Sequence, residues 1–482
     1  MSSDVVVVGA GIAGYATALW LRRAGATVTL VTKGVGGLPL STGTIDVLGR
    51  LGGAAGPCGP AGGATDSERM VRRPVARPLS EIQDGGLLPA GHPYLTIGRQ
   101  AVVRGVEDFA ALVGPQLLTW RQDDGAAGPE NLWLPTAVGA VRPSFLVPPS
   151  MQDSVLTDGG RYLVVGLRRL KDLTPELVAG NLNRTELPGG GRVQARALTI
   201  DLEVRDGEQD SSGLVHARAL DRTPARESLV QALSGHVREG ETVLLPAVLG
   251  MEDPQVFSWL SQRLGAPVGE IPLPPPSVPG LRLENRLARL ASDERVRLVQ
   301  GAGVVSAEVR DGRLVSVTSA AAGRTLTHRA GAFVLATGGF ESGALTLDSH
   351  GQVRETVLGL PVAGVVDDGE ENLRRLVHND YWGKPQGLFR VGVLTDSQMR
   401  PIGPDGEPVL DGLRAVGGLL AGAVRWSECS GEGIALGAAR AATDSLLAEA
   451  EATGGEANEG AGRTPSSAPP SAGGPEMTKE TY

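Results

Sequence analysis

The sequence contains few of the residue types that hold metal ions. Of its 482 residues only two are cysteines, Cys58 and Cys429, and six are histidines. The cysteines form no CxxC pair and the histidines form no HxxxH or HExxH pattern, so neither a zinc site nor an iron–sulfur cluster is expected on this chain. The low cysteine content fits a reducing, cytoplasmic compartment, although a single disulfide between the two is also compatible with it.

Positive charge and long apolar runs are also scarce. Lysine and arginine number 45 against 54 aspartate and glutamate residues, a net charge of −9, which argues against nucleic-acid binding and leaves no polybasic membrane anchor. The apolar stretch at residues 5–21 is shorter than the roughly 20 residues of a membrane span, has no basic segment before it and contains three glycines. Any membrane contact is therefore expected to be peripheral and made through a partner.

The chain is too long for one hydrophobic core, and two or three domains are expected. Hydrophobic residues make up 41% and charged residues 21%, as in soluble folded proteins. The 69 glycines and 33 prolines follow no three-residue period, so they indicate loops rather than collagen. Their local enrichment predicts a flexible insertion at residues 50–90 and a disordered tail at 453–482.

A glycine-rich turn stands near the N-terminus. Residues 5–8 form a β-branched apolar run, which Gly9, Gly11 and Gly14 separate from a helical pattern and a second apolar run at 27–31. In this strand-turn-helix-strand context, GxGxxG is a dinucleotide-binding signature. The first glycine permits the tight turn, the second lets the backbone approach a phosphate, and the third lets the helix pack closely on the strand. The N–H groups at the helix start would face the anion.

One element of this signature is missing. Where an acidic residue would bind the ribose hydroxyls, the second strand ends in Thr32 and Lys33. Thr32 is a candidate for a ribose hydrogen bond and Lys33 for a phosphate contact, but both also fit an ordinary solvated strand end. Ser41, Thr42 and Gly43 follow, and they predict either a hydroxyl loop against a cofactor or a capped turn.

Two later segments also end in glycine turns. A buried apolar strand ends at Thr337 and Gly338, which predicts a strand end on the ligand side of a sheet. Further along, Gly417 precedes a turn ending in Gly433, which opens an alanine-rich helix expected over residues 434–450. A helix N-terminus opened by glycine is a second place for phosphate or flavin ring oxygens.

Together the three glycine segments resemble the Rossmann flavoprotein plan, in which both chain ends build one cofactor domain around an inserted domain. We therefore expect an α/β fold with a Rossmann-like FAD/NAD(P)-binding flavoprotein domain and an inserted mixed α/β domain. The expected parts are a flavin-binding domain from 1–49, 296–345 and 411–452, the flexible insertion 50–90, an inserted cap or interaction domain 91–295, a cap return 346–410, and the tail 453–482.

Within that class, residues 3–450 closely resemble the B subunit of the anaerobic glycerol-3-phosphate dehydrogenases. The most specific match is a Pro-Pro-Ser-Val segment that leads into an Arg-Leu-x-Asn helix. The matching segments are Leu40-Ser41-Thr42-Gly43-Thr44-Ile45-Asp46, His92-Pro93-Tyr94, Pro275-Pro276-Ser277-Val278 with Gly280, Arg282, Leu283 and Asn285, then 336–340, Gly392-Val393-Leu394-Thr395-Asp396 with Arg400-Pro401, and 429–433.

The resemblance implies a heterotrimeric oxidoreductase of glycerol metabolism. It would oxidise sn-glycerol 3-phosphate to dihydroxyacetone phosphate and pass the electrons to membrane quinone during anaerobic respiration. In that family the catalytic A subunit carries its own FAD, and the membrane-anchoring C subunit carries iron–sulfur clusters. The B subunit is usually described as an FMN protein, and the missing ribose acid fits FMN, while GxGxxG leaves FAD open. The chain would then lie at the inner face of the cell membrane, held there by its partners.

Oxidation of this substrate requires a base and fixed cations. Arginine donates hydrogen bonds in pairs to phosphate, so Arg142, Arg282 and Arg400 are candidate phosphate ligands, each with a salt bridge as the alternative. His92 is the candidate base, with a structural role before Pro93 as the alternative. Three functions stay open: a catalytic flavin subunit, a non-catalytic flavin relay or scaffold, and a stand-alone flavin oxidoreductase of the fumarate-reductase or ketosteroid-dehydrogenase kind.

Overall fold

The structure is a computed structural model that describes residues 2–53, 71–84, 86–119, 129–366, 369–377, 379 and 386–460. Residues 54–70 and 85 of the predicted insertion, Cys58 among them, and the tail from residue 461 lie outside the described residues. Within the described part, none of the helices has the length and apolar character needed to cross a bilayer. The same part contains no group of three or more side chains suited to hold a metal ion.

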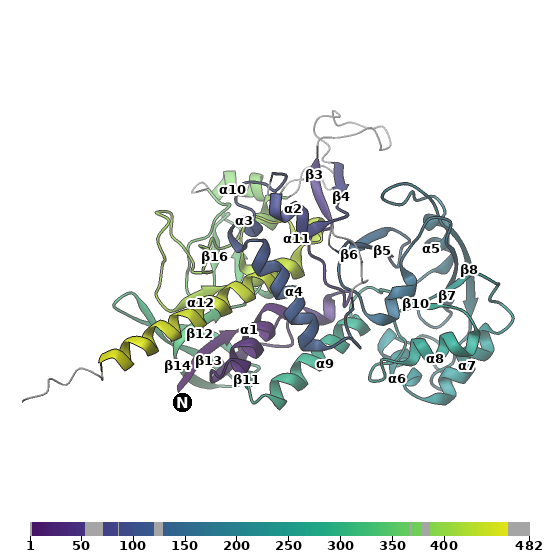
Figure 1. Cartoon of the computed structure of the whole chain (residues 1–482), viewed down its shortest axis with the longest axis horizontal. Coiled ribbons are helices and arrows are strands. Elements are labelled where there is room, and N and C mark those ends of the chain that lie inside the picture. Colours follow the sequence, from purple (N-terminus) through teal and green to yellow (C-terminus); the bar gives the residue numbers. More distant parts are fainter. Residues whose placement is uncertain are drawn as a thin grey trace, which may run out of the picture.

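A seven-stranded sheet forms the centre of the larger lobe (Figure 1). β1 is parallel to β2 on one side and to β14 on the other, and β14, β13 and β12 form an antiparallel meander. The expected N-terminal strands and the expected meander after residue 296 are thereby confirmed. In order across the sheet the strands are β11 (Arg297–Gln300), β2 (Val28–Thr32), β1 (Ser2–Val8), β14 (Arg324–Leu335), β13 (Arg313–Ala321) and β12 (Gly303–Arg310), with β17 (Leu413–Ala415) beside β14.

Both ends of the chain build this lobe. Helix α1 (Ile12–Arg23) packs against α12 (Gly431–Gly460), and α12 packs against α4 (Arg99–Val113). The α4–α12 contact is close because Gly105 faces the backbone of Leu436, where a side chain would overlap it. The predicted C-terminal helix is confirmed, and α12 continues to residue 460, beyond the start of the tail expected at residue 453.

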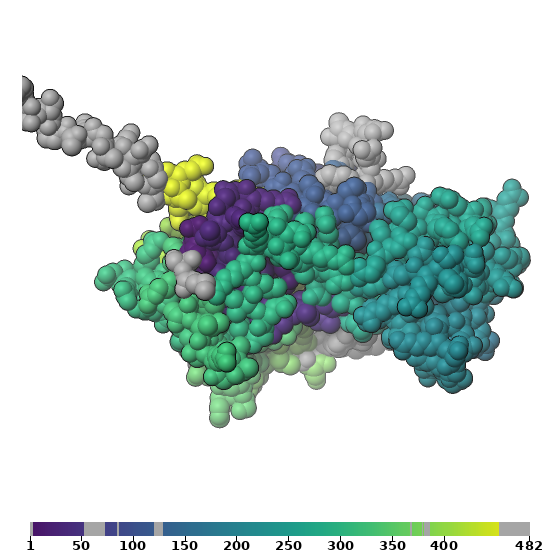
Figure 2. All heavy atoms as spheres, turned by 90° about the horizontal axis from the view of Figure 1, so that it is seen from below, coloured from purple at the N-terminus to yellow at the C-terminus, as the bar shows by residue number. Residues whose placement is uncertain are grey.

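The smaller lobe contains a parallel sheet of its own (Figure 1). Figure 2 shows it projecting beside the larger lobe. Three of its four strands are buried on both faces, as expected for a parallel sheet covered by helices, whereas the edge strand over residues 194–200 is mostly half-buried. The strand order is β10 (Val268–Ile271), β9 (Thr242–Pro246), β7 (Arg161–Leu167), β8 (Gln194–Ile200), and the helices are α5 (Pro175–Leu182), α6 (Gly213–Leu220), α7 (Thr223–Leu233) and α8 (Val256–Leu264).

The smaller lobe has a separate hydrophobic core, which runs from Leu156 to Val278. This range is narrower than the inserted domain expected at residues 91–295. Helix α4 belongs to the first core because its apolar stripe packs on α12. Helix α9 (Val278–Asp293) joins the lobes, since its first residue lies in the second core and its later leucines lie in the first. We propose residues 156–278 as the inserted unit.

Short elements complete the fold and border the site described next. They are η1 (Leu38–Leu40), β3 (Arg50–Gly53), β4 (Val71–Pro74), α2 (Pro78–Asp84), α3 (Pro93–Ile97), β5 (Leu132–Pro135), β6 (Val141–Ser144), η2 (Pro149–Ser154), η3 (Phe340–Ser342), β15 (Leu345–Leu347), β16 (Val353–Glu355), α10 (Gly369–Leu376), η4 (Gly387–Arg390), η5 (Gly417–Leu419) and α11 (Arg425–Glu428).

Candidate cofactor site

The three glycines of the first turn have different surroundings. A side chain at Gly9, whose φ is 110°, would overlap the backbone of Ala336. A side chain at Gly14 would overlap the carbonyl oxygen of Gly9. At Gly11, by contrast, an added Cβ would meet no atom within 4 Å. Gly9 and Gly14 therefore allow close backbone packing, and Gly11 leaves room for a ligand at the N-terminus of α1.

This open position faces a cavity of about 650 Å³ at the carboxyl ends of β1 and β2, which we call the outer cavity. Ligands bind at this edge of parallel sheets because the strand ends and helix N-termini converge there. Its lining residues are Val8, Gly9, Ala10, Gly11, Val31, Thr32, Lys33, Gly34, Val35, Gly36, Gly37, Leu40, Ala302, Gly303, Val304, Ala336, Thr337, Gly338, Glu341, Ser342, Gly343, Ala344, Thr356 and Val357.

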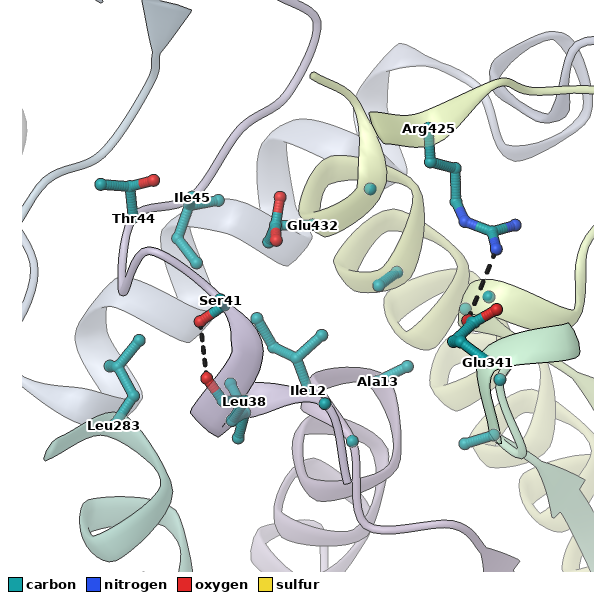
Figure 3. Close-up of a pocket in the computed structure, with 18 residues that line it drawn as sticks. Ile12, Ala13, Leu38, Ser41, Thr44, Ile45, Leu283, Glu341, Arg425 and Glu432 are labelled. Carbon is teal, nitrogen blue, oxygen red and sulfur yellow. Dashed lines mark hydrogen bonds and ion pairs between the residues drawn. The ribbon is translucent and has the colours of Figure 1, made fainter. Parts of the chain in front are cut away.

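A second, inner cavity of about 200 Å³ lies between the N-termini of α1 and α12 (Figure 3). It shares several lining residues with the outer cavity, Gly11 among them, so the two form one site. Its lining residues are Gly11, Ile12, Ala13, Gly37, Leu38, Ser41, Thr44, Ile45, Leu283, Ala336, Gly338, Glu341, Gly417, Gly418, Arg425, Gly431, Glu432 and Ala435.

Most of the predicted cofactor residues lie at these cavities. Gly9, Gly11, Thr32, Lys33, Thr337 and Gly338 line the outer cavity, and Ser41 and Gly417 line the inner one. The others serve packing. Gly14 lies beneath the turn, Gly43 lies against Pro279, and Gly433 lies against Tyr94 and Val47, where a side chain would overlap its neighbour. Thr42 forms a hydroxyl pair with Thr44 at 2.7 Å and lines neither cavity.

Two of the predicted hydroxyl ligands are already engaged in turns. Thr32 Oγ1 donates to the carbonyl of Gly34 at 2.6 Å, and Ser41 Oγ donates to the carbonyl of Leu38 at 2.8 Å. The capped-turn interpretation therefore describes Ser41, whereas Thr32 is neither free for a ribose nor solvated, since it is buried and bonded within its own turn. Thr337 differs, because its hydroxyl is buried without a hydrogen-bond partner in the described residues while the residue lines the outer cavity. A buried polar atom without a partner is costly, and a ligand would relieve that cost.

Replacing Thr337 with valine tests this assignment. In the cofactor-free chain we expect Thr337→Val to leave the melting temperature unchanged or to stabilise the fold by about 1 kcal/mol, since an unpaired buried hydroxyl is removed. Cofactor affinity should fall by roughly 5- to 10-fold, the value of about one hydrogen bond. Thermal melts and fluorescence titration measure both. Thr443→Val is the control, because that hydroxyl donates within α12 to Ala439 at 2.8 Å and lines neither cavity. Unchanged affinity in Thr337→Val would contradict the assignment.

His92 has a structural position. It caps the N-terminus of α3, where its Nδ1 accepts the N–H of Tyr94 at 3.2 Å, and its Nε2 lies 3.2 Å from the carboxylate of Glu428. The ring is 1% exposed and lines neither cavity. With Nδ1 accepting, Nε2 carries the proton and donates it to Glu428. Both ring nitrogens are engaged, so the structure does not place His92 as the expected base.

Arg142 pairs with the buried Asp46. Its Nη2 donates to the carboxylate of Asp46, which is 1% exposed, and this neighbour raises the pKa of the arginine further. Arg142 and Asp46 line neither cavity. The position of Arg142 supports the salt-bridge interpretation.

Arg282 and Arg400 also form salt bridges away from the cavities. Arg282 lies between the lobes, where it pairs with the fully buried Glu270 at 2.8 Å and donates to the carbonyl of Gly250. Arg400 pairs with Asp396 at 2.6 Å inside one loop, and Asp396 also accepts the backbone N–H of Arg400. The structure therefore brings none of the three predicted phosphate ligands to the cavity.

Three ionisable residues that line the inner cavity, Glu341, Arg425 and Glu432, were not predicted from the sequence. Arg425, at the start of α11, pairs loosely with Glu341 at 3.7 Å (Figure 3), and burial lowers its pKa. Glu432, in the first turn of α12, has a pKa of about 7, raised first by burial and then by the charge of Asp46. The sequence gives one signal for Glu432, an acidic residue between two glycines at a helix start.

The parallel strands, the open glycine position and the cavity at the α1 N-terminus define a nucleotide-binding protein of the α/β class. The chain belongs to the family described as FAD binding domain, whose model matches residues 4–434. The predicted α/β flavoprotein fold is therefore confirmed, and the cofactor of the site is a flavin.

Several proteins are similar to the chain over most of its length. It is 29% identical over 452 residues to the B subunit of a probable anaerobic glycerol-3-phosphate dehydrogenase of Halobacterium salinarum, covering 92% of this chain and 97% of that protein. It is 27% identical over 457 residues to the B subunit of the anaerobic glycerol-3-phosphate dehydrogenase of Pectobacterium carotovorum, covering 93% and 99%. Among solved structures, a 3-ketosteroid-Δ4-(5α)-dehydrogenase from Rhodococcus jostii matches with a TM-score of 0.39 and 15% identity, covering 92% and 96%.

Proposed function

We propose that this chain is the flavin-carrying B subunit of an anaerobic glycerol-3-phosphate dehydrogenase. In this role it oxidises sn-glycerol 3-phosphate to dihydroxyacetone phosphate, and the electrons pass to membrane quinone. One observation carries the proposal: the similarity to the two B subunits spans more than nine-tenths of this chain and of each of theirs.

We propose FAD as the cofactor in place of the expected FMN. The outer cavity continues past the N-terminus of α1 to the ends of β2 and β11, where Lys33, Ala302 and Gly303 line it. FMN, which has one phosphate and no adenosine, would leave this part of the site unfilled, whereas the adenosine half of FAD would occupy it. Gly11 and the α1 N-terminus would face the diphosphate, and the exposed ammonium of Lys33 would add positive charge.

The residues of the chain have defined tasks around this cofactor. The turn at Gly9 and Gly11 and the hydroxyl of Thr337 would hold it, and the apolar Ile12, Leu38 and Leu283 would exclude water from the inner cavity. When bound, the flavin supplies the acceptor for a hydride. Exclusion of water strengthens electrostatic interactions at the reacting groups.

We also propose that the chain works within a heterotrimer. Its partners would be the FAD-bearing catalytic A subunit and the iron–sulfur C subunit, which would hold the complex at the inner face of the membrane and pass electrons to quinone. The names of the similar proteins, each the B subunit of a larger enzyme, support this assembly.

A reduction experiment on the purified chain tests the function. The released cofactor is identified by chromatography, and sn-glycerol 3-phosphate is added to the flavin-loaded chain without oxygen. We expect FAD, and we expect its visible absorption to bleach, whereas the enantiomer sn-glycerol 1-phosphate should have little effect. Recovery of FMN would contradict the cofactor assignment.

The remaining outcomes separate the alternatives. Flavin that bleaches only after the FAD-bearing partner is added would make the chain a relay. If glycerol 3-phosphate does not reduce the flavin, but fumarate reoxidises flavin that has been reduced chemically, the chain is a stand-alone fumarate-reductase-like enzyme. A chain that binds no added flavin would contradict the assignment of the cavities.

A further inference from the structure

The wall of the inner cavity carries one arginine, Arg425, and two carboxyl groups, Glu341 and Glu432, in different surroundings (Figure 3). Arg425 has a partner, since its guanidinium lies 3.7 Å from Glu341. Glu432 lies beside Ile45, apart from that pair, and has no arginine or lysine within salt-bridge distance among the described residues. The inner cavity therefore contains one carboxyl group without a cation of its own.

The cation whose charge lowers the pKa of Glu432, Arg142, is already engaged. Arg142 donates to Asp46, whose carboxylate is buried, so one positive charge stands beside two acidic groups. Burial and the charge of Asp46 raise the pKa of Glu432 to about 7, while Arg142 and the backbone N–H groups of Asp46 and of Glu432 itself lower it. The Glu432 carboxyl is thus poised between its neutral and charged forms at neutral pH.

The thiol of Cys429 and the phenol of Tyr94 also lie near Glu432. Burial raises the pKa of the Cys429 thiol to about 11 and holds the pKa of the Tyr94 phenol well above its usual value. Both remain neutral, and Arg425 remains charged at neutral pH despite its lowered pKa. The groups that face Glu432 from the packed elements are Asp46 from the loop after η1, Tyr94 from α3, Arg142 from β6, Arg425 from α11 and Cys429 after it.

We propose that Glu432 is the catalytic residue that accepts the hydroxyl proton of the substrate in the inner cavity. The O–H bond at C2 would break and its proton would move to a carboxylate oxygen of Glu432, while the C2–H bond would break and its hydrogen would leave with the electron pair. The substrate carbon would become a ketone, and the flavin, when bound, would supply the two-electron acceptor. This assignment rests on the proposed function, because only oxidation of an alcohol at this chain needs such an acceptor.

Glu432→Gln tests the assignment in the flavin-loaded chain. In rapid mixing with glycerol 3-phosphate, the wild-type bleaching rate should rise with pH through about 7, since only the ionised carboxylate accepts a proton. Glu432→Gln should bleach roughly 10²- to 10⁴-fold more slowly and lose this inflection. Glu432→Asp should keep the inflection at a reduced rate. Glu284→Gln is the matched control, because burial also raises the pKa of Glu284 but the residue lies outside both cavities.

A thermal melt of the cofactor-free chain gives a second readout. The folded state raises the pKa of Glu432, so the stability of the wild type should fall as pH rises from about 4.5 through about 7. Glu432→Gln should melt at the wild-type temperature at pH 5 and above it at pH 8. Equal melting temperatures at both pH values would overturn the proposal.

The kinetic outcomes distinguish the role of Glu432 from the proposed function of the chain. If glycerol 3-phosphate bleaches the wild type, and Glu432→Gln keeps its rate and pH profile, Glu432 is not the proton acceptor and the proposed function stands. If the wild type binds flavin that dithionite reduces but glycerol 3-phosphate does not, the proposed function fails, and the role of Glu432 fails with it.

Discussion

A chain carrying Gly11→Ala should fold as the wild type does and bind FAD at least about 100-fold more weakly. Gly11 has a φ of −79°, which alanine adopts without strain, and an added Cβ would meet no protein atom within 4 Å. The methyl group would instead enter the space shared by the two cavities at the N-terminus of α1. Loss of two charge-assisted N–H contacts, each worth about 1.5–3 kcal/mol, gives an effect of this size.

Two further variants control this experiment. Gly180→Ala, in α5, also adds a methyl group that meets no atom within 4 Å, but far from the cavities, so FAD affinity should not change. Gly14→Ala should yield little folded protein, because its side chain would overlap the carbonyl oxygen of Gly9. Fluorescence titration with FAD measures affinity and thermal melts measure folding. Wild-type affinity in Gly11→Ala would mean that the diphosphate binds elsewhere.

Arg282→Met should destabilise the protein by about 3–5 kcal/mol, since it leaves a buried carboxylate without its cation. The side chain of Glu270 is 0% exposed and that of Arg282 is 9% exposed. Glu270 also accepts the hydroxyl of Ser150 at 2.5 Å and the N–H of Leu249 at 2.6 Å, so the carboxylate is fixed in place. Denaturant unfolding followed by circular dichroism measures the loss.

Arg374→Met is the matched control. Arg374 also pairs with a glutamate, Glu370, but both side chains are about three-quarters exposed, so the change should cost less than about 0.5 kcal/mol. The comparison also decides between two interpretations of Arg282. If Arg282 bound the substrate phosphate, its replacement would raise KM and leave the stability unchanged. The salt bridge seen in the structure instead requires that the replacement lower the stability.

The N-terminal part of the fold was predictable from sequence because its signals are local. An apolar run, glycines at fixed spacing and a helical pattern specify the β1–α1–β2 unit within one short segment. The late strand ending at Thr337 and the helix opened by glycine near residue 431 were predictable for the same reason. The assignment of α4 to the first core was not, because it depends on packing against α12 from the far end of the chain.

Charged site residues were harder to predict, because a sequence shows a residue type without its partner. Arg282 fits phosphate binding until Glu270 is found beside it, and His92 fits a base until Glu428 is found beside it. Glu432, by contrast, was not predicted although it lines the inner cavity. Its pKa depends on Asp46 and on burial, and neither is visible in the glycine turn that carries it.

The split construction of the larger lobe has a consequence for protein synthesis. The smaller lobe is contiguous, so its core is complete once residue 278 has left the ribosome. The cofactor cavities need β14, β17 and the start of α12 as well as β1 and α1. At a synthesis rate of roughly 5–20 residues per second, the start of α12 is therefore made on the order of 20–80 s after the N-terminal glycine turn. A nascent chain therefore contains a complete smaller lobe before the flavin site exists, and the flavin can bind only when translation is nearly over.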